Sequence, residues 1–468
     1  MSAIDPLEAA LAVRPTPGTP RPYHFPAFDR SALSGGLPLL TVRIPGRPLV
    51  TASLVLPTGA ADEPAADGGA TVLAARAMTE GTERYDGVAL VEAAERLGAT
   101  LRAEAGWDAT FVGVDVPVAR LAPALALLAE VARRPTFPVR EVERLRDQRL
   151  NDILQARADP GRRADEAFAA AIYDPASPFS RPAGGLPGTV AALDPDACRR
   201  ALHRWPGFDR AALIVAGDLA GVDVAALAEP LLGDLAPGTA VDGTEDPVAV
   251  GTVERTFVRL VHRPGSVQSE IRIGHVGLPR RVPDYHAVVV MAAILGGLFN
   301  SRLNLRLREE RGYAYGAGAG FDFRRLAGPF SARTAVDTAA TVPAIADTLA
   351  ELRRIREEPV SEDELRIARD YLVGVFPLRF ETPGPVVGAL AGLVTHELPD
   401  DELDAYRPAI EAVTAADVQA AARAHLDPDR TAIVVVGDAD AVGPDLDAAG
   451  FGPVEVVRDE AGEGATHG

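Results

Sequence analysis

The segment RAALIVAGD at residues 210–218 recurs as RTAIVVVGD at residues 430–438, and five of the nine aligned positions are identical. The two copies are 438 − 218 = 220 residues apart. A helical stretch precedes each copy, DPDACRRALHRW in the first half and TAADVQAAARAH in the second. Because the register holds without a gap, the pattern indicates a duplicated structural unit.

Further matches extend the repeat toward the start of each half. PLVTASLVL begins at Pro48 and SVQSEIRIG at Ser266, and alternating apolar and β-branched residues predict a strand in both. An apolar helical segment follows each strand, GGATVLAARAM and HAVVVMAAILGG. Strands and helices alternate irregularly, so we expect an α+β fold with an antiparallel or mixed sheet in each half, rather than a doubly wound parallel sheet.

The repeat also predicts the domain boundaries. Residues 1–235 form the first domain and residues 254–456 the second, each of ordinary domain size. Residues 236–253 are rich in Gly, Pro, Asp and Thr without helical or strand periodicity, which predicts a linker. Residues 457–468 are expected to be a disordered tail.

Composition narrows the classes of partner and of chemistry. The 468 residues are 47% hydrophobic and carry a formal charge of −19, which argues against a nucleic-acid or anionic-membrane surface. Cys198 is the only cysteine, so an internal disulfide framework and a cysteine-rich metal site are excluded, and we expect it to be a buried small hydrophobe. The N-terminal residues do not read as a signal peptide, and eighteen consecutive apolar residues occur nowhere, so a cytoplasmic location is expected.

A longer motif points to a family. Residues 295–315, LGGLFNSRLNLRLREERGYAY, resemble the second-domain signature of the M16 family, which comprises insulinase, pitrilysin and the mitochondrial processing peptidase. Gly81 and Thr82 after the first apolar helix, the VAGD and VVGD segments and the duplication fit the same resemblance. It implies two homologous insulinase-like domains, each a sheet packed with helices, that form half of a clam-shell chamber.

The metal motif of that family is missing. Active members carry His-x-x-Glu-His, which sets two zinc-binding His on one helical face beside a Glu that acts as general base. Aligning Gly69 and the Gly-Thr pair places Val72, Ala75 and Arg76 at those three positions. The last ligand position falls at Asn151 or Asp152. Val and Ala offer no lone pair and Arg is a permanent cation, so we expect no metal here.

Other catalytic patterns are also absent from the sequence. The histidines are scattered singly and are expected to be surface or structural residues: His24, His203, His262, His275, His286, His396, His425 and His467. There is no Gly-x-Ser-x-Gly elbow, and Cys198 lacks a nearby His-Asp pattern, although a triad can be assembled in space. The glycines of GYAYGAGAGF, residues 312–321, are followed by no phosphate-binding Lys and suit a strand.

By resemblance, Arg308 and Tyr315 are the candidates for contacts with substrate. In related peptidases an Arg and a Tyr of the second domain position the peptide and stabilise the oxyanion on the scissile carbonyl. Arg306 and Tyr313 have the same seven-residue separation, so either pair could face the chamber. The alternative is that these arginines pair with Glu309 and Glu310 and that the tyrosines pack in the sheet.

The segment before Arg306 contains a candidate for a Gly-rich loop. In non-catalytic subunits of the family a Gly-rich loop is implicated in admitting substrate. Here the candidates for such a loop are Gly296, Gly297 and Phe299, and a plain tight turn is an equal alternative.

The resemblance predicts a zinc-free, non-catalytic subunit that binds no cofactor itself. Its partner would be a separate M16 subunit that carries His-x-x-Glu-His and the zinc, and the substrates would be unfolded peptides. Two alternatives remain open: a structural or peptide-binding scaffold with no role in proteolysis, and an enzyme with a relocated metal site.

Overall fold

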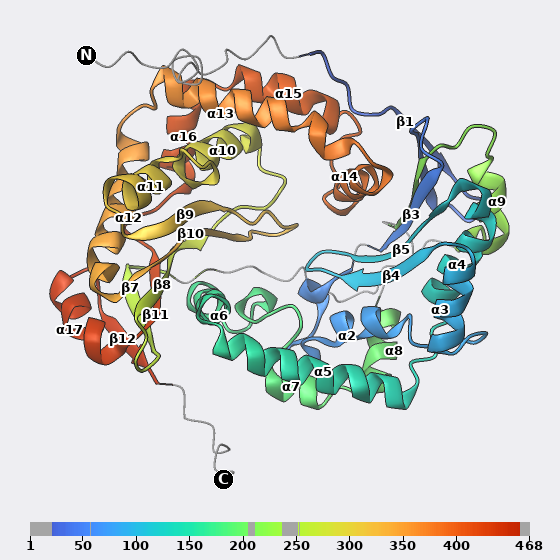
Figure 1. The fold of residues 1–468 in the computed structure, drawn as a ribbon, viewed down its shortest axis with the longest axis horizontal. Helices are drawn as coiled ribbons and strands as arrows, with labels where there is room; N and C mark the ends of the chain where they lie inside the picture. The colour runs from blue at the N-terminus through green and yellow to red at the C-terminus, as the bar shows by residue number, and fades with distance from the viewer. Residues whose placement is uncertain (1–20, 57, 205–210, 236–250, 252, 459–468) are drawn as a thin grey trace, which may run out of the picture.

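The computed structural model describes residues 21–56, 58–204, 211–235, 251 and 253–458. Two six-stranded sheets form its framework (Figure 1), in the orders β1-β2-β6-β3-β5-β4 and β12-β7-β11-β8-β10-β9. Five strands of one sheet have a counterpart at the same place in the other, which confirms the duplication. β2 and β6 are parallel, as are β7 and β11, whereas β3 and β8 pair antiparallel with both neighbours. The sheets are therefore mixed, and the predicted α+β class is confirmed.

The first sheet and its helices come from the N-terminal half of the chain. The strands are β1 (Phe28–Ala32), β2 (Pro38–Arg43), β3 (Leu49–Leu56), β4 (Thr100–Ala105), β5 (Thr110–Pro117) and β6 (Ala212–Gly217). The helices are α2 (Ala70–Ala77), α3 (Gly87–Arg96), α4 (Leu121–Arg133), α5 (Val139–Ala158), α6 (Pro160–Ile172), α7 (Pro187–Ala191), α8 (Pro195–His203) and α9 (Val224–Leu232).

The second sheet repeats the plan in the C-terminal half. The strands are β7 (Phe257–His262), β8 (Gln268–Val276), β9 (Ala314–Phe321), β10 (Pro329–Asp337), β11 (Ala432–Gly437) and β12 (Val454–Val457). The helices are α10 (Tyr285–Ala292), α11 (Arg302–Asn304), α12 (Thr341–Glu357), α13 (Glu362–Val375), α14 (Pro383–Thr395), α15 (Glu402–Ala412), α16 (Ala415–His425) and α17 (Ala439–Ala449). The strand predicted for residues 312–321 is β9.

Most of the predicted linker lies outside the described residues, namely 236–250 and 252. The same holds for residues 459–468 of the predicted tail. Val457 closes strand β12 and Arg458 donates from Nη2 to Asp440 Oδ1 at 2.8 Å, so the ordered second half continues two residues past the predicted boundary.

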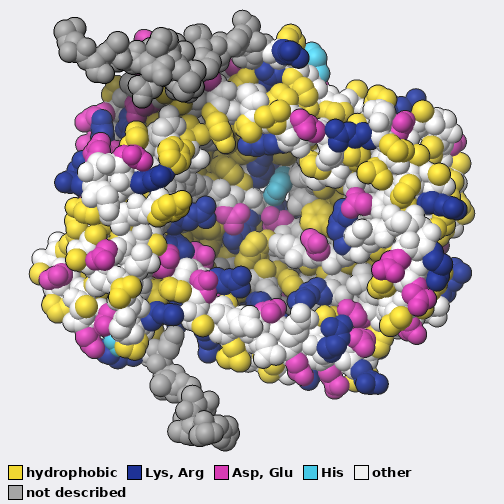
Figure 2. Space-filling view, viewed as in Figure 1, with side chains coloured by type: hydrophobic (Ala, Val, Ile, Leu, Met, Phe, Trp, Pro, Cys, Tyr) yellow, Lys and Arg dark blue, Asp and Glu magenta, His cyan; other side chains and the backbone are white. Residues whose placement is uncertain are grey.

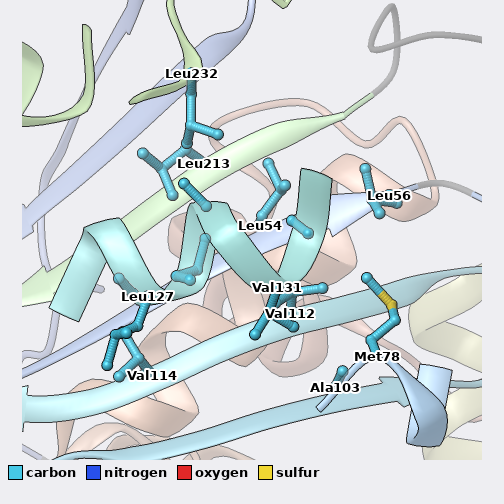
Figure 3. Close-up of a cluster of buried hydrophobic side chains, with 14 of the residues drawn as sticks. Leu54, Leu56, Met78, Ala103, Val112, Val114, Leu127, Val131, Leu213 and Leu232 are labelled. Carbon is cyan, nitrogen blue, oxygen red and sulfur yellow. The ribbon is translucent and has the colours of Figure 1, made fainter. Parts of the chain in front are cut away.

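Each half has a hydrophobic core between its sheet and its own helices. In the first half, alternate residues of β3, β5 and β6 point toward helices α4 and α9, as Figure 3 shows for Leu54, Val112, Leu213, Leu127 and Leu232. Cys198 is fully buried in the same core, as predicted from its sequence context. Burial raises the pKa of its thiol to about 12, so the thiolate is not accessible as a nucleophile near neutral pH.

The opposite face of each sheet is covered by a helix from the other half. Helix α14 packs its buried Val386 and Leu390 against Leu40 and Val55 of the first sheet. Helix α6 in turn packs Phe168 against the second sheet, in a cluster that includes residues of β7 and β11. Figure 1 shows α14 beside the first sheet and α6 beside the second. The two halves therefore exchange helices, and neither buries both faces of its sheet alone.

The repeated Gly-Asp at the end of β6 and β11 has a structural role. Asp218 Oδ2 accepts a hydrogen bond from the N–H of Gly46 at 3.2 Å, and Asp438 Oδ2 accepts from the N–H of Gly265 at 2.8 Å. Each carboxylate ties the following loop to the tight turn between the first two core strands of its half. The motif is thus explained by turn stabilisation in both copies.

The tips of the two sheets also meet between the halves. Asp108 Oδ2 accepts from the N–H of Arg325 at 2.9 Å, and the Arg325 guanidinium donates to Asp62 at 2.5 Å. The neighbouring Arg324 lies over the ring of Trp107, with 4.4 Å from Cζ to the ring centroid. Figure 2 shows that this face of the molecule is hollowed between the halves, with charged side chains around the hollow.

One segment, Tyr285–Glu310, is long and apolar enough to pass a length and composition test for a membrane span. However, 67% of its most apolar window is buried inside the protein, where it belongs to the core of the second half. Its apolar character is accounted for by that core.

The helix exchange predicts that a substitution in α14 unfolds the first half as well. Leu390→Ala removes a fully buried side chain, so it is expected to lower the free energy of unfolding by about 2–5 kcal/mol. Urea denaturation followed by tryptophan fluorescence reports on the surroundings of Trp107, which belongs to the first half and contacts Arg324 of the second. Leu378→Ala, at a side chain that is 65% exposed, is the control and should change the midpoint little. An unchanged tryptophan transition in Leu390→Ala would show that the halves unfold independently.

A half-buried histidine directly after α14 predicts acid sensitivity. Burial, with the charges of Arg280 and Arg325, lowers the pKa of His396 to about 4. The unfolded chain, with a pKa near 6.5, therefore binds more protons between about pH 6.5 and 4, and stability falls as the pH falls through that window. His396→Gln should remove part of this loss, on the order of 1–3 kcal/mol, in urea midpoints measured from pH 7 to pH 4. Parallel curves for wild type and variant would contradict the assignment.

Candidate functional site

Helix α2 is the element that would carry the metal site, and its start is held by a buried carboxylate. Gly69 precedes the helix with φ +96°, a left-handed conformation that glycine adopts without strain. Glu63 accepts hydrogen bonds from the N–H groups of Gly69, at 2.8 Å, and Thr71. Burial raises the pKa of Glu63, and these N–H donors oppose that rise. The helix start and the direction of its side chains are thereby fixed.

The three positions of the family's metal motif hold no metal donor. Ala75 is buried, Val72 is half-buried, and neither side chain has a lone pair. Arg76 turns toward α5, where its Nη1 lies 3.9 Å from Asp152 Oδ2. The structure thus brings together Arg76 and Asp152, the two charged residues that the sequence aligned with the site. A guanidinium occupies the neighbourhood of the carboxylate, so this donor set does not fit a zinc ion.

A second guanidinium, which sequence reasoning missed, lies close by. Arg149 is one turn before Asp152 on α5 and donates from Nε to the carbonyl oxygen of Gly184 at 2.9 Å. Burial lowers its pKa, while Asp152 and Glu166 act in the opposite direction and Arg76 adds to the lowering. The only signal for Arg149 in the sequence is its spacing of three residues from Asp152. The region is therefore occupied by fixed cations and their carboxylates.

The glycines before the Ser-Arg-Leu motif pack against strand β9. A Cβ atom added to Gly296 would lie 2.1 Å from the backbone nitrogen of Ala319, so only glycine fits at this position. Gly297 is exposed, and the nearest atom to an added Cβ is the carbonyl oxygen of Ala292 at 3.3 Å. At Gly296 the geometry is that of a close approach between a helix end and a sheet edge.

Asn304 connects the same turn to β9. Its amide donates from Nδ2 to the carbonyl oxygen of Phe299 at 2.7 Å, and its Oδ1 accepts from the N–H of Ala317 at 3.0 Å. Asn304 is buried, and both bonds are partly shielded from water. This side chain, which sequence reasoning did not single out, positions Phe299 beside the strand that carries Tyr315.

Arg306 and Tyr313 serve the second half's own structure. Arg306 donates to Asp347 Oδ1 from Nε at 3.1 Å and from Nη2 at 2.9 Å, and to Glu310 from Nη1 at 2.8 Å. Tyr313 is partly buried against the core of the second half. For this pair the structural alternative, ion pairing and packing, describes what the structure shows.

Arg308 and Tyr315 are arranged differently. The Arg308 Cζ lies 5.5 Å from the ring centroid of Tyr315 and 4.5 Å from that of Phe299. Tyr315 is 94% and Phe299 70% exposed, and the one carboxylate within 4 Å of Arg308 among the described residues is that of Glu309, at 3.5 Å. The guanidinium lies within cation–π distance of both rings, while its N–H groups donate in its own plane. The structure thus brings Arg308, Tyr315 and Phe299 together on an exposed surface.

Among the described residues, one other cluster has a composition that could hold a metal. Ligand atoms of His262, Asp438 and Asp440 lie within 4.8 Å of one another. His262 Nδ1 accepts from the N–H of Ala439 at 3.1 Å, and Asp438 caps α17 as well as binding the turn at Gly265. Asp440 is paired with Arg458. These contacts account for the cluster as the capped start of a helix.

Comparison with known proteins assigns the chain to a family. The model for insulinase, peptidase family M16, matches residues 39–178, and the model described as "Peptidase M16 inactive domain" matches residues 192–372. The chain belongs to the M16 peptidase family. It is a member in which the zinc-binding positions of the first domain are lost, and it has an inactive M16 fold.

Two similar proteins differ in whether their names denote a peptidase. An "Uncharacterized zinc protease" of Streptomyces coelicolor is 25% identical over 405 residues, which cover 84% of this chain and 86% of that protein. The "Non-peptidase homolog YmxG" of Helicobacter pylori is 21% identical over 318 residues, covering 67% and 72% of the two chains.

Solved structures confirm the fold. A peptidase M16 inactive domain from Pseudomonas fluorescens superposes with a TM-score of 0.80 at 24% identity, covering 88% of this chain and 98% of that one. A protease from Helicobacter pylori gives a TM-score of 0.79 at 16% identity, covering 88% and 99%.

The ion pair at the degenerate metal position is expected to contribute little to folding. Arg76 and Asp152 are each about 40% exposed, so their coupling should be about 0.2–1 kcal/mol in a double-mutant cycle of Arg76→Ala and Asp152→Ala. Urea denaturation of the four proteins gives this value. A coupling of several kcal/mol would mean that the pair is a buried structural element instead.

Proposed function

We propose that this protein is the zinc-free, non-catalytic subunit of a two-subunit M16 peptidase. In this proposal a separate M16 subunit with an intact His-x-x-Glu-His supplies zinc, general base and water. This chain supplies one wall of the chamber and the Arg308–Tyr315 pair. The observation that carries the proposal is the contrast between the two sites: the metal position is filled by an ion pair, whereas the exposed Tyr315 lies beside a half-buried Arg308.

The first part of this contrast concerns the ligand atoms and the charge at the metal position. Water activation by zinc needs imidazole or carboxylate ligands with free lone pairs. At the aligned positions this chain offers Val72, Ala75 and a guanidinium that lies beside the nearest carboxylate. Peptide hydrolysis in a complex of this chain therefore depends on the metal site of the other subunit.

The second part of the contrast concerns the hydrogen bonds that Arg308 and Tyr315 would donate to a substrate peptide. A guanidinium donates two parallel hydrogen bonds in its own plane, so Arg308 can bind the carbonyl oxygens of an extended peptide. The Tyr315 hydroxyl, at the end of a side chain that is almost fully exposed, is a further donor. When water attacks the scissile carbonyl, donors held at that oxygen stabilise the developing negative charge. We assign this role to Arg308 and Tyr315, and positioning of Arg308 to Phe299.

Reconstitution with a zinc-bearing M16 chain from the same organism tests the proposal. We expect a complex on size-exclusion chromatography and peptide hydrolysis that neither chain gives alone. Arg308→Ala and Tyr315→Phe should each leave the complex intact and lower kcat by about 10²-fold, because each removes a donor to the oxyanion. Arg366→Ala is the matched control, since Arg366 is paired with Asp363 and Asp370 on the exposed surface of α13.

Two results would contradict parts of the proposal. Absence of both a complex and a gain in hydrolysis removes the partnership itself. A complex whose hydrolysis is unchanged by Arg308→Ala and Tyr315→Phe would instead favour the scaffold function, in which the fold supports the partner without contacting the reacting bond.

A further inference from the structure

A cavity of about 500 Å³ lies where the two halves meet, away from Arg76 and Arg308. Ile172, at the end of α6, contributes from the first half. The second half contributes the end of β8, the C-terminal turns of α12 and α16, and the residues Leu426, Asp427 and Arg430. Figure 1 shows α6 beside the second sheet, where these elements come together. The cavity has the size of an ordinary small-molecule site.

The charged residues of the lining are mostly basic. Arg356, Arg423 and Arg430 face Asp427, which gives the lining a formal surplus of two positive charges in a chain whose total is −19. His425 also lines the cavity, and its Nε2 lies 2.7 Å from Asp284 Oδ2. The chain contains no lysine, so every basic side chain here other than histidine is a guanidinium.

Two of the three arginines have no carboxylate partner among the residues that the structure describes. Arg430 donates to Asp427 at 2.6 Å, so this pair is neutral. Arg423 donates from Nε to the carbonyl oxygen of Arg356 at 2.9 Å, and the Nε of Arg356 is buried without an acceptor. Within the described part of the chain, no carboxylate oxygen lies within 4 Å of either guanidinium. The negative helix ends of α12 and α16, about half a charge each, offset only part of this surplus.

Another part of the lining is uncharged and joined by hydrogen bonds. His275 Nδ1 lies 2.8 Å from the carbonyl oxygen of Val276, and its Nε2 accepts from the N–H of Asp427 at 3.2 Å. Burial lowers the pKa of His275, which keeps the ring neutral. Ile172, Val276 and Leu278 add apolar surface. The lining thus combines guanidinium groups with apolar side chains.

We propose that this cavity is a binding site for a small molecule that carries a phosphate group. Guanidinium groups match the oxygens of a phosphate bidentately, and Arg356 and Arg423 come from two helices that converge on the same cavity. A phosphate here supplies the anionic partner that these two guanidinium groups lack among the described residues. The site uses residues of both halves, so its ligand also bridges them. The inference is independent of the proposed peptidase partnership.

Calorimetric titration of the full chain with pyrophosphate, at low ionic strength, tests the site. We expect saturable binding that Arg356→Gln and Arg423→Gln each weaken at least about tenfold, because each removes a charge-assisted donor. Arg353→Gln is the matched control: it lies one turn earlier on α12, pairs with Asp429, and is not part of the cavity lining. Its affinity should equal that of the wild type.

Arg423 is exposed, so Arg423→Gln should fold. This variant keeps the test decisive if Arg356→Gln folds poorly. Absence of saturable heat with the wild type would overturn the proposal. So would a loss of affinity in Arg353→Gln as large as that in Arg423→Gln, because binding would then follow general surface charge.

Discussion

The exchange of helices α6 and α14 between the two halves is the constraint on which the rest of the structure depends. Each sheet buries one face with its own helices and the other with a helix from the opposite half. The two halves are therefore held at a fixed relation, further secured where Asp108 binds Arg325. This relation sets the positions of Arg76 and Arg308, which belong to different halves. The duplicated fold thus becomes a single scaffold.

Arginine side chains have different surroundings at the degenerate metal position and at Arg308. At the degenerate metal position, Arg76 lies beside a carboxylate, and neighbouring Arg149 is bonded to a backbone carbonyl, so positive charge is satisfied internally. At the exposed site, Arg308 has aromatic rings near it and keeps its in-plane donors available. In the proposed function this chain supplies substrate contacts, and the metal belongs to the other subunit. That division is the physical basis of the proposed partnership.

Much of the fold could be predicted from the sequence because the signals are local and repeated. Alternation at residues 48–56 and 266–274 marked β3 and β8, and the aligned glycines located the degenerate metal position. The helix exchange could not be predicted, since an apolar segment such as Pro383–Thr395 shows that it is buried but not against which sheet. The choice between Arg306 and Arg308 likewise required the position of Asp347, which is distant in sequence. Phe299 and Asn304 acquire their roles only when the turn lies against β9.

The central claim, that this chain holds no zinc of its own, is tested most directly by metal analysis of the purified protein. The full chain would be dialysed against zinc, passed through a desalting column and measured by inductively coupled plasma mass spectrometry. The account predicts far less than one zinc per chain, because Val72, Ala75 and Arg76 provide no ligand and the guanidinium repels a cation. One tightly held zinc per chain, together with peptide hydrolysis by the chain alone, would contradict it.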